Sequence, residues 1–252
     1  MMSAWKEDMI RFMNDASEQS DFHRLLAKKI AQRIGSGGHV CDAGCGLGYL
    51  SRAMSPYFDK ITSIDISRNA MADLQTQVAA GQYPNIHPIC GDIHAIHPEP
   101  LYDKMVFCLY GQLSEILTIA RQQCRGKIII IKKNWPCHAF SLTHPPRHGR
   151  SLGQICDLLD QYQIPYLAES CAIELGQPLR SLADAVRFFR LYSHDPNPEA
   201  ITPAQVLPLL TAGGSEEFPY YLPASKKIGI LVLDVRQIPD VFGFEEAAEA
   251  SL

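Results

Sequence analysis

The sequence has no hydrophobic run long enough to cross a membrane, because it contains no stretch of about 18 apolar residues. Its opening segment, MMSAWKEDMIRFMNDASEQSD, carries acidic side chains where a secretory signal peptide has an uninterrupted apolar stretch. We therefore expect a cytoplasmic protein that does not bind a membrane.

Cys-x-x-Cys pairs are also absent, although the chain has eight cysteines. Structural zinc sites commonly take their thiolates from such pairs, so no metal site is expected. Several cysteines, such as Cys108, lie inside apolar, strand-like segments. Reduced and mostly buried thiols are the better expectation for a chain without a secretory signal.

An excess of positive charge is missing as well, because the formal net charge is −4. This balance disfavours a nucleic acid as partner. One segment is nevertheless basic: no Asp or Glu lies between Glu115 and Asp157, while several Lys and Arg do. It predicts either a site for an anionic acceptor, at Lys132, Lys133 or Arg147, or a solvated basic face.

Strand-like and helix-like segments alternate along most of the chain, which is typical of an α/β fold. The pattern predicts a doubly wound, mostly parallel, seven-stranded sheet with helices on both faces, N-terminal helices, and a helical insertion before the last strand. We expect one domain over residues 1–252. Its parts are an N-terminal helical cap (1–34), a Rossmann-like core (37–175 and 225–237), an insertion or lid (176–222) and a tail (238–252).

A glycine-rich segment, Asp42-Ala43-Gly44-Cys45-Gly46-Leu47-Gly48, follows the first predicted strand. In a doubly wound sheet, ligands bind beyond the carboxyl ends of the strands, and glycine lets a ligand approach backbone N–H groups closely. A dinucleotide fingerprint needs a glycine where this chain has Tyr49, so a nucleotide-dependent oxidoreductase is the least favoured enzyme class.

Acidic residues follow the next two predicted strands. Asp65 ends the second strand, where a carboxylate can accept hydrogen bonds from both ribose hydroxyls. Asp92 follows the third strand. The alternative is that such acids cap the next helix, which Asp65 could do through Ser67 and Asn69.

Together these motifs resemble those of class I methyltransferases, whose cofactor loop has the form (D/E)xGxGxG. The resemblance covers residues 37–135 well and implies S-adenosylmethionine as methyl donor and S-adenosylhomocysteine as product. It places Asp92 opposite the adenine amino group and Ile66 and Ile93 against the adenine faces. The expected cofactor-binding residues are Asp42, Gly44, Cys45, Gly46, Gly48, Asp65, Ile66, Asp92 and Ile93.

The acceptor side has weaker signals. Methyltransferases that act on nucleobases or glutamine usually have an (N/D/S)PP(Y/F) signature after the fourth strand, where this chain has Cys108-Leu109-Tyr110-Gly111. Methyl transfer needs a base only when the acceptor must lose a proton, and Tyr110, His138 and His144 are the candidate catalytic residues.

We therefore predict methyl transfer by direct displacement to a small acceptor molecule, with an anionic acceptor as the hypothesis that the basic segment suggests. Two alternatives stay open: methylation of a protein or RNA, and non-catalytic binding of S-adenosylmethionine or S-adenosylhomocysteine. The sequence specifies neither the acceptor atom nor the oligomeric state.

Overall fold

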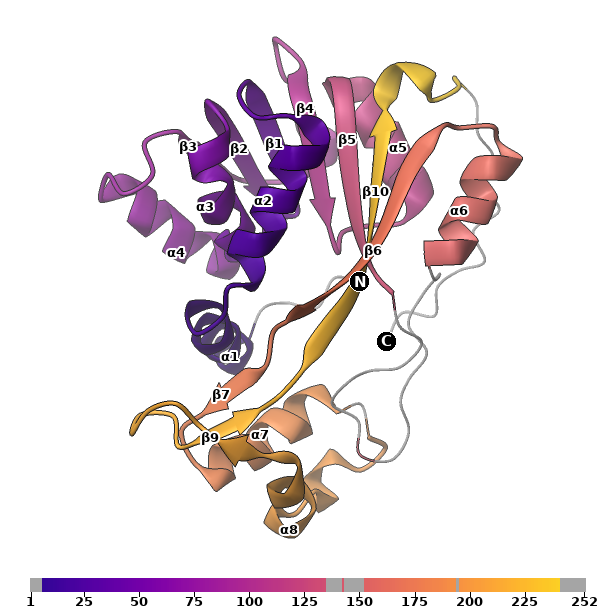
Figure 1. Ribbon diagram of the computed structural model, residues 1–252. Coiled ribbons are helices and arrows are strands. Elements are labelled where there is room, and N and C mark those ends of the chain that lie inside the picture. The colour runs from indigo at the N-terminus through magenta and orange to yellow at the C-terminus, as the bar shows by residue number, and fades with distance from the viewer. Residues whose placement is uncertain (1–5, 135–141, 143–151, 194, 241–252) are drawn as a thin grey trace.

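The computed structural model describes residues 6–134, 142, 152–193 and 195–240. A seven-stranded sheet runs through the molecule in the order β3-β2-β1-β4-β5-β10-β6 (Figure 1). β10 is antiparallel to both of its neighbours, and the other pairs are parallel. Its strands are β1 (His39–Ala43), β2 (Lys60–Asp65), β3 (Ile86–Cys90), β4 (Tyr102–Cys108), β5 (Cys124–Lys133), β6 (Tyr166–Glu174) and β10 (Ser225–Asp234).

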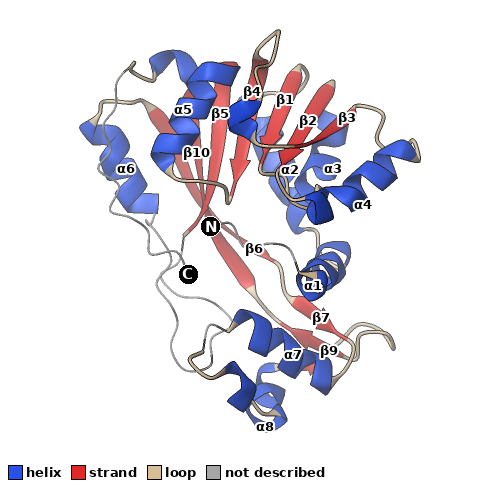
Figure 2. Cartoon of the chain, turned by 180° about the vertical axis from the view of Figure 1, so that it is seen from behind, coloured by secondary structure: helices blue, strands red, loops and turns tan. Residues whose placement is uncertain are grey.

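Helices cover both faces of this sheet. Figure 1 shows α2, α3 and α4 in front of the strands, and Figure 2, from behind, shows α5 over the opposite face. The helices are α1 (Glu7–Glu18), α2 (Phe22–Ile34), α3 (Tyr49–Met54), α4 (Arg68–Ala79), α5 (Leu113–Gln123), α6 (Leu152–Gln161), α7 (Leu182–Tyr192) and α8 (Pro203–Val206). The predicted fold class is thereby confirmed.

The central strand β5 shows why the sequence forms this layered structure. Ile129 and Ile131 pack on the face covered by α2, α3 and α4, whereas Ile128 and Ile130 pack on the face covered by α5 and α6. All four side chains are fully buried. A strand buried on both faces needs a continuous apolar run, because successive side chains point to opposite sides.

A third apolar cluster joins α1 to the segment between β6 and β10. Phe12 of α1 is fully buried and packs edge-to-face on Phe188 of α7, with ring centroids 5.1 Å apart. This segment also contains a small sheet, β7-β9-β8, which the sequence analysis did not predict. Its strands are β7 (Gln177–Leu179), β8 (Thr211–Ala212) and β9 (Tyr220–Leu222).

The predicted helical insertion is less helical than expected. Within it, α8 ends at Val206 and is followed by a 3-10 turn, Leu207–Leu209, and by β8. Pro208 lies in that turn and has no N–H to continue an α-helical ladder. The insertion is therefore a mixture of helix and strand.

Candidate functional site

The glycine loop connects the carboxyl end of β1 to α3. Gly44, Gly46 and Gly48 have φ values of 71°, 54° and 74°, a left-handed conformation that favours glycine. The backbone N–H groups of Gly44 and Cys45 donate to the carbonyl of Ile64 at 2.8 and 3.0 Å. These bonds hold the loop beside the end of β2.

Asp65 lies where the sequence analysis placed it, at the last position of β2. One carboxylate oxygen accepts from the N–H of Gly46 at 2.8 Å, and the other accepts from the N–H of Ser67 at 2.8 Å. The side chain of Ser67, not that of Asp65, accepts from Ala70 and caps α4. Because each carboxylate oxygen has two lone pairs, Asp65 keeps the capacity to bind a pair of hydroxyls while it orders the loop.

Asp42, the last acid before the glycines, is 1% exposed. Its carboxylate accepts from the Ser51 hydroxyl of α3 at 2.5 Å, and Ser51 in turn accepts from Ser63 at 2.8 Å. Burial raises the pKa of Asp42 to about 6, and the nearby charge of Asp65 adds to this rise. The hydrogen bond from Ser51 lowers the pKa but does not outweigh burial. Asp42 thus fixes the start of α3 relative to the loop.

The residues expected around an adenine ring differ in exposure. The Asp92 carboxylate accepts from the N–H of His94 at 3.0 Å, which starts the short turn Ile93–Ala95. Ile66 is 54% exposed at the edge of the sheet, whereas Ile93 is 4% exposed and packs in the core on the α5 side. The Ile66 side chain is therefore open to a ligand, and that of Ile93 is not.

Tyr110 lies directly against the glycine loop. A Cβ added to Gly44 would stand 2.2 Å from Cδ2 of the Tyr110 ring. The preceding residue, Leu109, has a φ of 55°, a strained conformation for leucine and one that accumulates at functional sites. Lys132 stabilises this turn by donating to the carbonyl oxygens of Tyr110, at 2.8 Å, and Gly111.

Glu115 is a site residue that the sequence analysis missed. It accepts from the Tyr110 hydroxyl at 3.1 Å, and the ring nitrogen Nε2 of His94 lies 3.2 Å from the same oxygen. Burial and the Glu115 charge raise the pKa of Tyr110, so the phenol keeps its proton. The available signal was the capping-box spacing Gln112-x-x-Glu115, which marks the start of α5.

The remaining acceptor-side candidates divide into two groups. Lys133 is half-buried at the end of β5, and burial lowers its pKa. His138, His144 and Arg147 lie outside the described residues. The structure thus brings together these predicted residues: those of the glycine loop, Asp65, Asp92 and Tyr110.

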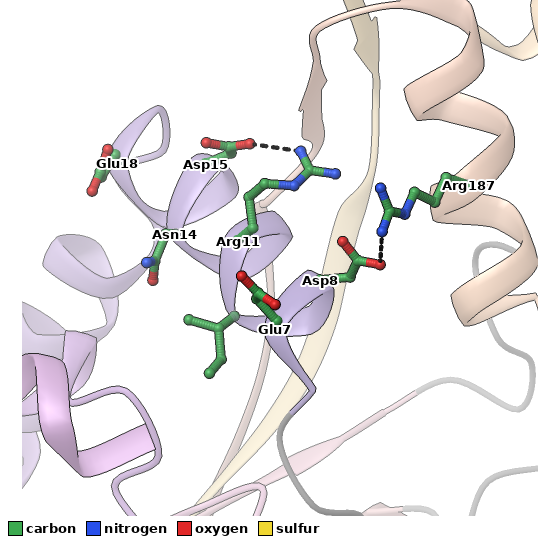
Figure 3. A pocket seen from close by; sticks show the side chains of 8 residues that line it. Glu7, Asp8, Arg11, Asn14, Asp15, Glu18 and Arg187 are labelled. Atoms are coloured by element: carbon green, nitrogen blue, oxygen red, sulfur yellow. Dashed lines mark hydrogen bonds and ion pairs between the residues drawn. The ribbon is translucent and has the colours of Figure 1, made fainter. Parts of the chain in front are cut away.

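A cavity of about 720 Å³ lies between α1 and α7 (Figure 3). Its walls are mostly charged, and Asp8 pairs with Arg187 across it at 2.6 Å. Asn14, also on its wall, accepts a hydrogen bond from the Tyr49 hydroxyl at 2.9 Å. Since Tyr49 follows Gly48, this cavity borders the helix that begins at the glycine loop.

Two negative findings apply to the described part of the chain. No group of three or more His, Cys, Asp or Glu side chains lies close enough together there to hold a metal ion. Among the same residues, every helix is too short or too polar to span a bilayer.

Comparisons with known proteins agree with this geometry. Residues 40–125 match a family described as a methyltransferase domain. The ubiquinone biosynthesis O-methyltransferase of Coxiella burnetii is 29% identical over 115 residues, which cover 41% of this chain and 49% of that protein. The chain therefore matches about half the length of these curated relatives.

Solved structures share the fold at low sequence identity. The YcgJ protein of Bacillus subtilis superposes with a TM-score of 0.55 and 12% identity, covering 84% of this chain and 97% of that one. A proposed methyltransferase of Bacillus halodurans gives a TM-score of 0.54 and 8% identity, with coverage of 84% and 98%. At these identities the likeness shows the fold alone.

Proposed function

We propose that the whole chain is an enzyme that methylates a small anionic molecule, because residues 40–125 belong to the class I family of S-adenosylmethionine-dependent methyltransferases. The family uses S-adenosylmethionine, in agreement with the cofactor predicted from the glycine loop and Asp65. The observation that best supports the proposal is the bond between Asp65 and the N–H of Gly46, which joins the two motifs into one site.

The residues present fit this cofactor. Gly44, Gly46 and Gly48 have a left-handed backbone that favours glycine, so no side chain at these positions stands between the loop and a ligand. Asp65 has lone pairs for the ribose hydroxyls, and exposed Ile66 offers an apolar surface for the adenine. Asp42 and Asp65 together make the site negative, which suits a ligand with an ammonium and a sulfonium group.

The bound cofactor supplies a methyl group on a positively charged sulfur, which leaves as a neutral thioether when the acceptor attacks. Because the sulfonium is already activated, the chain's main contribution is to align the acceptor with that methyl group. An acceptor that must lose a proton needs a base as well. Tyr110 lies beside the loop, but its protonated hydroxyl donates to Glu115, so its proposed role is to orient the acceptor, and His138 and His144 stay the predicted bases.

A small acceptor is supported by the Coxiella burnetii relative, whose name describes O-methylation in ubiquinone biosynthesis. The anionic class is supported by the segment between Glu115 and Asp157, which has several Lys and Arg but no Asp or Glu, and in which Lys133 lies at the carboxyl edge of the sheet. Location in the cytoplasm and the absence of a nucleic-acid partner stay predictions.

The test is calorimetry with S-adenosylmethionine, S-adenosylhomocysteine and NAD. We expect binding of both adenosyl ligands and none of NAD. Asp65→Ala should weaken S-adenosylhomocysteine binding tenfold to a hundredfold, since charge-assisted hydrogen bonds contribute about 1.5 to 3 kcal/mol each. Asp73→Ala, a carboxylate on α4 bonded to Gln77, is the matched control and should leave the affinity within twofold.

A methyl-transfer screen of small carboxylates, phosphates and phenols then follows on the protein that binds. Equal affinity in Asp65→Ala and wild type, or tighter binding of NAD, would contradict the assignment of the cofactor site. Binding without transfer to any small molecule, together with transfer to RNA or protein, would replace the small acceptor by a macromolecule.

A further inference from the structure

Two lysines lie side by side at the carboxyl edge of the sheet. Lys133 ends β5, and β10 begins at the same edge because it is antiparallel. Ile228 is the register partner of Lys133, and Lys226 comes two residues before Ile228. Since side chains alternate between faces, Lys133 and Lys226 both point to the face where Ile131 and Ile228 pack. This is the face covered by α2, α3 and α4.

Lys133 and Lys226 have no counter-charge in the described part of the chain. Among these residues, neither lysine forms an ion pair or a side-chain hydrogen bond. The acids of the adjacent strand β6 are engaged elsewhere: Glu169 pairs with Lys29 and Arg33 of α2, and Glu174 accepts from the Tyr221 hydroxyl. The described residues thus provide no acid to these two neighbouring, half-buried cations.

This arrangement is unfavourable in the absence of a ligand. Burial lowers the pKa of Lys226 to about 8, and the charge of Lys133 adds to the effect. Burial also lowers the pKa of Lys133. Folding does not require charges here, because the next residues along the same strand faces are buried isoleucines and a valine. Unfavourable charge retained at a half-buried position is typical of binding sites.

The surroundings of Lys226 connect it to the cofactor loop. Its charge acts on the thiol of Cys108, at the end of β4, and that thiol also experiences the charge of Asp42. On the other side, Lys226 acts on His23 of α2. The His23 ring stacks on Tyr49, which follows Gly48, with centroids 5.4 Å apart.

Polar atoms without partners lie on the same side of the loop. Nδ1 of His23 is buried with no hydrogen-bond partner among the described residues, and the same holds for Nε and Nη2 of Arg52, whose guanidinium lies over the Tyr49 ring. Burial, then the charges of Lys226 and Arg52, lowers the pKa of His23 to about 3, so this ring is neutral at neutral pH. These cationic and uncharged nitrogen groups therefore lie on one side of the loop, where Glu18 and Asp73 are the carboxylates whose charges act on Tyr49.

We propose that Lys133 and Lys226 bind the anionic group, a carboxylate or a phosphate, of the methyl acceptor, beside the glycine loop. This inference rests on the proposed function, because it places the acceptor at the donor's end of the site. It adds Lys226, which the sequence analysis did not consider, and it names the charge of the group that the acceptor presents.

The experiment measures anion binding directly. Calorimetry with inorganic phosphate and with benzoate, on protein saturated with S-adenosylhomocysteine, compares wild type with Lys133→Met and Lys226→Met. Methionine keeps an unbranched apolar chain, so the variants should fold. Lys227→Met is the matched control, since Lys227 is the exposed neighbour on the opposite face of β10.

We expect each of the first two variants to lower the anion affinity at least tenfold, and Lys227→Met to change it less than twofold. The preferred anion, phosphate or benzoate, identifies the acceptor class. Wild-type anion affinity in Lys226→Met, or an equal loss in Lys227→Met, would overturn the inference. Failure of the wild-type protein to bind S-adenosylhomocysteine would instead contradict the proposed function, and anion titration of the ligand-free protein would still decide the lysine site.

Discussion

The carboxylic acid of Asp42 is almost completely buried. It accepts a hydrogen bond from the Ser51 hydroxyl, and the negative charge of Asp65 lies nearby. Its pKa rises from 3.8 to about 6, so the folded chain binds the proton more tightly than the unfolded chain does. Protonation of Asp42 therefore adds to the free energy of unfolding below about pH 4, and this contribution is lost as the pH rises through about 6.

Asp42→Asn should therefore stabilise the protein at neutral pH. The amide copies the shape of the protonated acid and still accepts from Ser51, so the gain in the free energy of unfolding at pH 7 should be about 2 to 3 kcal/mol, falling to near zero at pH 3.5. Urea denaturation at both pH values measures it. The exposed Asp157→Asn is the control, and a gain of the same size at both pH values would show that ionisation of Asp42 is not the cause.

At the level of single residues, the cofactor motifs could be predicted and the lysine pair could not. Asp65 and the glycines follow a fixed spacing after apolar strands, and that spacing alone brings them to one edge of the sheet. Lys226 lies in the polar segment Ser225-Lys226-Lys227. The pattern of hydrophobicity therefore did not indicate that β10 includes these first residues. Its neighbour Lys133 is 93 residues away in sequence, and only the antiparallel register brings them together.

At the level of elements, the contact between the glycine loop and the turn after β4 can be tested by a double-mutant cycle. Gly44→Ala adds both the strain of a positive φ, about 1 to 2 kcal/mol, and overlap with the Tyr110 ring. Tyr110→Ala removes the ring, and with it the hydrogen bond to Glu115, but leaves the backbone strain at position 44 unchanged. We expect the double variant to be more stable than the sum of the single losses by about 1 kcal/mol or more, measured by urea denaturation of all four proteins.

The variant Gly81→Ala separates the loss of stability caused by backbone strain from the loss caused by overlap with a ring. Gly81 has a φ of 77°, and a Cβ there would meet nothing within 4 Å, so this variant carries the backbone strain without an overlap. It should lose less stability than Gly44→Ala and show no coupling to Tyr110→Ala. Strict additivity between Gly44→Ala and Tyr110→Ala would mean that ring and loop are not in contact.

For the whole molecule, the doubly wound, mostly parallel sheet could be predicted from the sequence because its core is built from local β-α-β units with right-handed crossovers. The insertion was harder to predict. Its small sheet has strands of two or three residues, which are too short for a period of two to appear, and its packing partner is α1, from the opposite end of the chain.

Ion pairs join the two distant parts of the chain that meet at this packing surface. Asp15 of α1 is 6% exposed and accepts from Arg180 at 2.6 Å and from Arg11 at 3.4 Å. Arg11 continues to Asp184 of α7 at 2.6 Å. A carboxylate that is largely buried between two guanidinium groups contributes more than an exposed one, because its partners lose their counter-charge when it is removed.

Asp15→Asn should cost about 2 kcal/mol of unfolding free energy, reduced from the value for a fully buried pair because Arg180 is 41% exposed. Asp21→Asn is the control: Asp21 and Arg24 are both largely exposed, so its loss of stability should be clearly smaller than that of Asp15→Asn. Hydrogen exchange localises the effect, because amides of α1 and α7 should exchange faster while those of β4 and β5 keep wild-type rates. If exchange quickens equally in the central strands, the ion pairs stabilise the whole domain and do not specifically fasten the insertion to α1.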